Sequence, residues 1–176
     1  MCGIAGFFDG NADFTANREK YENILQKMQQ SILHRGPDEQ GIYLGKRAGL
    51  AHTRLRSLTS KMAPSLWADA EERILIRLFI MARSIMQGNF AKRCSRRDGV
   101  FRLHQIQKWS LLAFLEYGPE FVIRLNGILP FAILDERHDT LYLYRDSFGI
   151  KPLFYTQQNG MVLFGSEPKA ILSYPG

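Results

Sequence analysis

Cys2, the second residue of the chain, is the side chain best placed for nucleophilic chemistry. Because Cys2 is small, the initiator methionine is normally removed in front of it, which would leave the thiol beside a free α-amine. An α-amine has a pKa of about 8 and can take the thiol proton directly or through a water. Cys2 is therefore a candidate N-terminal nucleophile. The letters MCG also fit a cysteine buried in an apolar strand, so the rest of the sequence must decide.

Five further motifs follow the opening MCGIAGFF in a set order. They read HRGPDEQG, AHTRL, RLNG, RDSFGIKPLFY and FGSEPKAIL. In order and spacing they resemble the class II glutamine amidotransferase domain, and RGPDEQG, GIKPL and GSEPKAIL favour the branch found in asparagine synthetases. The resemblance covers Met1–Leu55 and Leu111–Gly176. It implies a fold of the N-terminal nucleophile hydrolases, an αββα sandwich in which two antiparallel sheets lie between helical layers.

The resemblance also implies a reaction and a substrate, L-glutamine. The Cys2 thiolate attacks the side-chain amide of glutamine, ammonia leaves, and water hydrolyses the glutamyl thioester. Arg54 matches the arginine that holds the substrate carboxylate, a task suited to its planar fork of donors, with Leu55 beside it in the substrate site. By itself, Arg54 also fits a solvated strand arginine. His34 and His52 are expected to be structural, because an N-terminal nucleophile needs no histidine base, and we expect no metal or cofactor in this domain.

The family pattern requires two more elements, between AHTRL and LLAF. One is an Asn-Gly-Glu in a strand reading like YNGEIYN, whose Asn side chain and Gly amide form the oxyanion hole. The other is an Asp in an SDTEV element, which with the Glu holds the glutamine. By position, Met81, Ala82 and Arg83 stand in place of Asn, Gly and Glu, and Ile106 stands in place of the Asp. The sequence as written therefore predicts a domain with little or no activity.

The genetic code offers an explanation for the missing motifs. With suitable third bases, LFIMARSIMQ read from the third base of the Leu78 codon spells I-Y-N-G-E-I-Y-N-A. The same shift turns RSLTSKMAPSLW into I-I-D-I-K-D-G-A-Q-P-M and DGVFRLHQIQKWS into W-R-F-Q-T-T-S-D-T-E-V-V. Three family motifs in one register indicate that Arg56–Ser110, 55 residues, is out-of-frame translation between two compensating frame changes. We expect this segment to be irregular and to disrupt the centre of the fold. An unshifted gene that encodes an active domain remains the alternative.

The net charge of +6 and the isoelectric point near 9.5 would ordinarily indicate an anionic partner. The positive charge is confined to residues 56–110, which hold 11 Lys and Arg against 4 Asp and Glu, whereas the remainder holds 12 against 13. A basic module that contacts nucleic acid through residues 56–110, with KRCSRR as its best feature, is the alternative function. The frame shift accounts for the same charge, so a nucleic-acid partner is not expected.

The motifs require elements that position them, and the apolar patterns supply these. Arg18–Leu33 repeats apolar residues at helical spacing, which predicts an amphipathic helix. Asn159-Gly160 marks a hairpin, and Gly118 should end a helix. Strands are predicted at CGIAGFF, GIYL, AGLAHTRL, PFAILDE, TLYLYRD, PLFYTQ and MVLFGSE, and helices at LLAFLEYG, PEFVIRLNG and EPKAILSY. Successive hairpins with covering helices predict an α+β layered domain.

The length of 176 residues suits a single domain, 1–176. No apolar run is long enough to span a bilayer, no secretory signal is evident, and two cysteines argue against a disulfide scaffold. These observations predict a cytoplasmic protein with no membrane partner. The resemblance implies a synthetase domain or subunit that would use ATP and magnesium, and this domain is expected to be absent from the chain because no Ser-Gly-Gly pyrophosphatase loop occurs.

Overall fold

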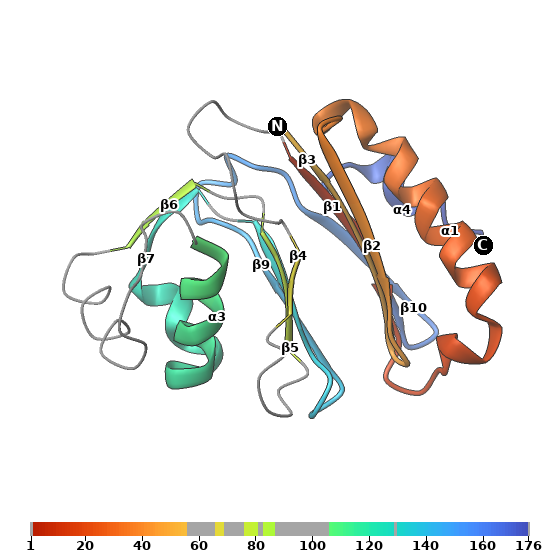
Figure 1. The fold of residues 1–176 in the computed structure, drawn as a ribbon, viewed down its shortest axis with the longest axis horizontal. Helices are drawn as coiled ribbons and strands as arrows, with labels where there is room; N and C mark the ends of the chain where they lie inside the picture. The colour runs from red at the N-terminus through yellow and green to blue at the C-terminus, as the bar shows by residue number, and fades with distance from the viewer. Residues whose placement is uncertain are drawn as a thin grey trace.

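The computed structural model describes residues 2–55, 66–68, 76–80, 83–86, 106–128 and 130–175. Two β-sheets pack face to face, with helices α1 and α4 covering one and helix α3 covering the other (Figure 1). This is the αββα order of layers that the sequence resemblance predicts. Among the described residues, no helix is long and apolar enough to cross a membrane.

The first sheet has its N-terminal strand at its centre. Its strand order is β10-β11-β1-β3-β2, and every pair is antiparallel. The strands are β1 (Gly3–Phe8), β2 (Glu39–Leu44), β3 (Ala48–Arg54), β10 (Phe154–Gln158) and β11 (Met161–Gly165). The predicted hairpin at Asn159 and Gly160 is confirmed, since both residues have the positive φ (51° and 86°) that this tight turn requires. Because β1 is paired on both sides, the sheet constrains the position of Cys2, the residue that precedes this strand.

The helices α1 (Arg18–Ser31) and α4 (Pro168–Leu172) bury one face of this sheet. Phe7 of β1 packs edge-to-face on Phe14 with ring centroids 4.7 Å apart. Gly49 lies directly opposite Phe7, and a Cβ there would come within 2.4 Å of the Phe7 ring, so a glycine is needed at this position. The core of this layer consists of Ala5, Phe7, Phe14, Ile24, Leu25, Met28, Ile32, Leu44, Ala51 and Ala170.

The second sheet has the order β4-β5-β8-β9, and β6 pairs with β7 in a separate two-stranded sheet. Helix α3 (Ile106–Tyr117) covers the outer face of the four-stranded sheet. The helix stops at Gly118, whose φ of 67° confirms the predicted end. The strands are β4 (Leu66–Ala68), β5 (Ile76–Ile80), β6 (Arg83–Met86), β7 (Leu125–Ile128), β8 (Phe131–Asp135) and β9 (Thr140–Tyr144). Between the sheets the buried core is Ile4, Ala48, Leu50, Ala132, Leu134, Leu153 and Phe164.

The prediction that Arg56–Ser110 is irregular and disrupts the fold is wrong for the described part of that segment. β4, β5 and β6 fall within it, and β5 is an inner strand, hydrogen-bonded to β4 on one side and to β8 on the other. The physical reason lies in Ile76–Ile80, IRLFI, whose β-branched and aromatic residues suit a strand whatever chemistry their side chains carry. The KRCSRR stretch lies outside the described residues.

Candidate active site

Cys2 lies at the N-terminal end of β1, the central strand of the first sheet. Gly3, the first residue of β1, is paired with Thr53 in β3, so extending the register by one residue places Cys2 opposite Arg54. Alternate residues of a strand point to the same face. Cys2 therefore faces the space between the sheets, as Ile4 does, and it packs against the core there. The cysteine is half-buried and its thiol is free.

The two residues predicted to bind substrate lie beside this thiol. The Cys2 Sγ is 3.9 Å from the carbonyl oxygen of Leu55, whose side chain is partly exposed. Arg54 ends β3 and is buried, and its Nη1 donates to Oε2 of Glu39 over 3.0 Å. The structure thus brings Cys2, Arg54 and Leu55 together at one sheet edge. Their roles in substrate binding and catalysis stay predictions.

The loop of the HRGPDEQG motif fixes Arg54 in three ways. Glu39 is its direct neighbour across the β2–β3 pair. The Asp38 amide donates to the Arg54 carbonyl oxygen over 3.0 Å. Gly36 approaches so closely that a Cβ there would lie 2.4 Å from the Arg54 backbone nitrogen. The backbone and the guanidinium of Arg54 are both held by this loop, which gives a carboxylate-binding group a defined direction.

The same loop also contacts the cysteine. Nε of Arg35, a buried side chain, donates to the Cys2 carbonyl oxygen over 3.1 Å, and its Nη1 pairs with Oε1 of Glu167 over 2.9 Å. His34 Nε2 lies 2.9 Å from the same oxygen, and Lys169 Nζ lies 3.0 Å from Oε2. Burial acts to raise the pKa of Glu167, but hydrogen bonds from Arg35, Lys169 and His34 outweigh it and lower that pKa to about 2.

His52 and His34 take different environments. His34 is mostly exposed and contacts Glu167. His52 is buried in β3, and burial lowers its pKa to about 4, with Glu39 opposing this shift and Arg54 adding to it. Its ring fills the space above Gly41, where a Cβ would come within 2.4 Å of it. A neutral, packed imidazole in the sheet agrees with the prediction that His52 is structural.

The low pKa of His52 predicts a dependence of stability on pH. Because the folded pKa (about 4) lies below the unfolded value (about 6.5), the unfolded chain binds more protons in this window. The free energy of unfolding should therefore fall by about 2–3 kcal/mol as pH drops from about 6.5 to about 4. Urea unfolding at a series of pH values, with nuclear magnetic resonance titration of the ring, checks this. A His52 ring that titrates near its ordinary value would contradict it.

Charged residues that the sequence analysis did not single out belong to the site. Arg35, Glu39 and Glu167 all lie inside the quoted motifs HRGPDEQG and FGSEPKAIL, and this was the available signal. Lys151, from the GIKPL motif, is half-buried; burial lowers its pKa, while the nearby Cys2 raises it. Among the described residues, no group of three or more His, Cys, Asp or Glu is arranged to hold a metal ion.

Only some of the positions at which the family motifs are missing belong to the described residues. Met81 and Ala82 lie outside the described residues, Arg83 is the first residue of β6, and Ile106 is the first residue of α3. The described backbone is strand at Arg83, where the Glu would stand, and helix at Ile106, where the Asp would stand. Replacement of those side chains remains a prediction from the sequence.

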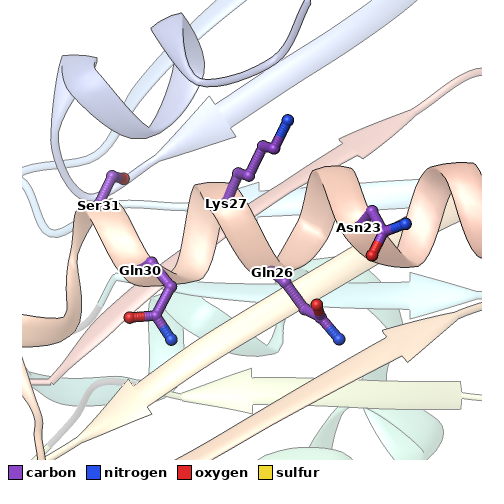
Figure 2. Close-up of a pocket in the computed structure, with 5 residues that line it drawn as sticks. All are labelled: Asn23, Gln26, Lys27, Gln30 and Ser31. Carbon is purple, nitrogen blue, oxygen red and sulfur yellow. The ribbon is translucent and has the colours of Figure 1, made fainter.

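A hollow of about 650 Å³ lies on α1, away from the predicted site (Figure 2). It is lined by Asn23, Gln26, Lys27, Gln30 and Ser31. All five of these residues come from α1, whose buried residues Ile24, Leu25 and Met28 lie on its other face. We interpret it as the solvated face of an amphipathic helix. The candidate site is the sheet edge at Cys2.

Comparison with known proteins identifies the family of this chain. Residues 1–76 and 93–176 match the family described as "Glutamine amidotransferase domain". The chain belongs to this family. Its match extends into both ends of Arg56–Ser110, so likeness to the glutamine amidotransferase domain is wider than the quoted motifs. Residues 77–92, which contain Met81, Ala82 and Arg83, are left unmatched.

The curated relatives include enzymes that hydrolyse glutamine. Asparagine synthetase [glutamine-hydrolyzing] 3 of Bacillus subtilis is 28% identical over 99% of this chain and 28% of its own length. Asparagine synthetase B [glutamine-hydrolyzing] of Escherichia coli is 31% identical over 98% and 30%, respectively. Amidase chyE of Penicillium rubens is 25% identical over 99% and 26%. The glutamine amidotransferase domain described here therefore spans about a quarter to a third of these relatives.

Two solved structures share the fold. Glutamine phosphoribosylpyrophosphate amidotransferase from B. subtilis, complexed with ADP and GMP, gives a TM-score of 0.74 at 14% identity, over 98% of this chain and 43% of that chain. A structure titled as the allosteric regulatory enzyme of purine biosynthesis gives 0.72 at 13% identity over the same shares. The fold predicted from the sequence, an αββα sandwich of the N-terminal nucleophile hydrolases, is confirmed.

Proposed function

We propose that this glutamine amidotransferase domain releases ammonia from L-glutamine at Cys2, as the first step of an amide transfer of the asparagine synthetase type. The observation that carries the proposal is the meeting of Cys2, Arg54 and Leu55 at one sheet edge, with the thiol 3.9 Å from the Leu55 carbonyl. The type of acceptor follows from the named relatives, of which this chain spans only part.

The chemistry divides between three groups. The Cys2 α-amine, freed by removal of Met1, takes the thiol proton, and the thiolate attacks the side-chain carbonyl carbon of glutamine. The same ammonium then protonates the departing amide nitrogen, so that ammonia leaves and a thioester remains for water to hydrolyse. Arg54 binds the substrate carboxylate through guanidinium donors that Glu39 does not occupy. These steps use no metal and no cofactor.

We further propose that the chain as written performs this reaction poorly. In the tetrahedral intermediate, negative charge gathers on the former carbonyl oxygen, and Met81 has no side-chain donor to offer it. Ile106 likewise replaces a carboxylate that would hold the substrate amine. Cys2 and Arg54, which attack and bind the substrate in this proposal, are both retained. The binding of glutamine and the reactivity of the Cys2 thiol should therefore be reduced less than the rate of glutamine hydrolysis.

Labelling of Cys2 by a diazo-ketone analogue of glutamine tests the site without requiring turnover. We expect slow labelling at Cys2 that glutamine suppresses. Arg54→Gln should lower its rate about tenfold or more, because a charge-assisted contact with the analogue's carboxylate is lost. Labelling by iodoacetamide, which has no carboxylate, should stay within about twofold and serves as the control. Peptide mass spectrometry measures both rates, and equal losses with both reagents would contradict a substrate-binding role for Arg54.

A further inference from the structure

The turn between β11 and α4 forms hydrogen bonds with the start of β1. Ser166 is fully buried and exchanges two hydrogen bonds with Ile4, from its own amide to the Ile4 carbonyl oxygen (2.8 Å) and from the Ile4 amide to its Oγ (2.9 Å). The next residue, Glu167, reaches toward Cys2 through Arg35. Two consecutive residues of one turn thus contact Ile4 directly and Cys2 through Arg35.

Glu167 uses its carboxylate to bind charged side chains and not to cap the backbone of its own helix. It occupies the position before α4 with extended backbone angles (φ −143°, ψ 145°), at which acidic side chains often cap the helix, but its side chain makes no capping bond. Instead one oxygen meets Arg35 and His34, and the other meets Lys169. With its pKa lowered to about 2, after hydrogen bonds outweigh the effect of burial, the carboxylate is an anion at neutral pH.

Cys2 depends on such contacts because it lies outside the sheet ladder. β1 begins at Gly3, and the residues at a chain end fray unless something ties them down. The Sγ contact with Leu55 is long, at 3.9 Å, whereas the Arg35 Nε–H reaches the Cys2 carbonyl oxygen at 3.1 Å. Arg35 itself is buried, and a buried guanidinium needs a counter-charge to keep its place. Glu167 supplies that charge at 2.9 Å.

We propose that Glu167 is a positioning residue for the nucleophile, acting through Arg35 on the carbonyl of Cys2 and so fixing where the thiol and the α-amine point. The role of the thiol rests on the proposed function, but the ordering of the chain start does not. Glu167 itself touches no reacting atom. Its effect should be seen in the order of residues 2–8 and in reactions that need a directed thiol.

The test compares Glu167→Gln with Lys169→Gln in the full chain. Both variants break an ion pair of the same carboxylate (2.9 Å to Arg35, 3.0 Å to Lys169), but only the first loosens Arg35. We measure the rate of Cys2 labelling by the diazo-ketone analogue divided by that with iodoacetamide. Glu167→Gln should lower this ratio roughly tenfold, since small misplacements of reacting groups cost large factors. Lys169→Gln should leave the ratio within about twofold, and an equal loss would overturn the proposal.

Hydrogen–deuterium exchange separates positioning from general loosening. In Glu167→Gln the peptide at residues 2–8 should exchange at least about threefold faster, with the α4 peptide unchanged. An equal rise in both peptides, or no rise in either, would overturn the proposal. If glutamine does not suppress labelling of the unmodified chain by the analogue, the proposed function fails, and the exchange result still decides the role of Glu167.

A double-mutant cycle tests whether the effect passes through Arg35. Once Arg35→Ala has removed the intermediary, adding Glu167→Ala should change exchange at residues 2–8 by less than about twofold. Independent, multiplying effects of the two substitutions would overturn the proposal, because Glu167 would then reach Cys2 by another route.

Discussion

Restoring the family reading of Arg56–Ser110 should raise ammonia release from glutamine by at least about a hundred- to a thousandfold over the chain as written. The restored chain regains the Asn amide and the Gly backbone amide that receive the oxyanion, which accounts for this factor. The Glu and Asp that hold the substrate add to it through binding. The measurement is kcat/KM for ammonia production from glutamine, with equal amounts of folded protein.

Two further chains make this comparison decisive. Cys2→Ala in the restored chain should bring ammonia release back to background, because the nucleophile is gone. A chain with Asn, Gly and Glu placed at Met81, Ala82 and Arg83 alone should recover part of the rate if the oxyanion donors matter most. Equal activity of the written and restored chains would refute the proposed loss of transition-state stabilisation.

The placement of Cys2 beside Arg54 could be predicted from the sequence because the features that bring it about are local. MCG and AHTRL each place reactive residues at the end of a strand, and pairing of the two strands brings Cys2 beside Arg54 without further information. The Asn159-Gly160 turn was predictable for a similar reason, since its two residues alone specify the backbone angles. Such features depend on a few neighbouring residues.

Other features depend on tertiary packing or on backbone preference, and here the sequence was less informative. The Arg35–Glu167 pair joins residues 132 positions apart, and nothing in either motif names its partner. At Ile76–Ile80 an expectation of irregular structure failed, because a strand needs a suitable pattern of side chains and not the family's chemistry. A change of reading frame can therefore preserve a strand and still remove the catalytic side chains that the family sequence would have placed there.

A chain extended in front of Cys2 should lose nearly all of its glutaminase activity, by about a hundred- to ten-thousandfold. An extension converts the α-amine into an amide, which cannot accept the thiol proton. Cys2 also stands at the end of a strand with neighbours on both sides, and its carbonyl is held by Arg35 at 3.1 Å. This contact does not involve the α-amine, so an extension should remove the base and leave the carbonyl contact in place.

A removable tag fused directly to Cys2 provides the cleanest measurement, made on the restored chain so that oxyanion donors are present. Before cleavage, ammonia release should be near background while iodoacetamide still labels Cys2, which shows that the thiol is reachable. After cleavage, intact mass should show a chain that begins at Cys2, and activity should appear in proportion to the cleaved fraction. The same tag at the C-terminus is the control and should not matter. Full activity before cleavage would mean that another base serves the thiol, and Lys151, the half-buried amine near Cys2, would be the first to replace.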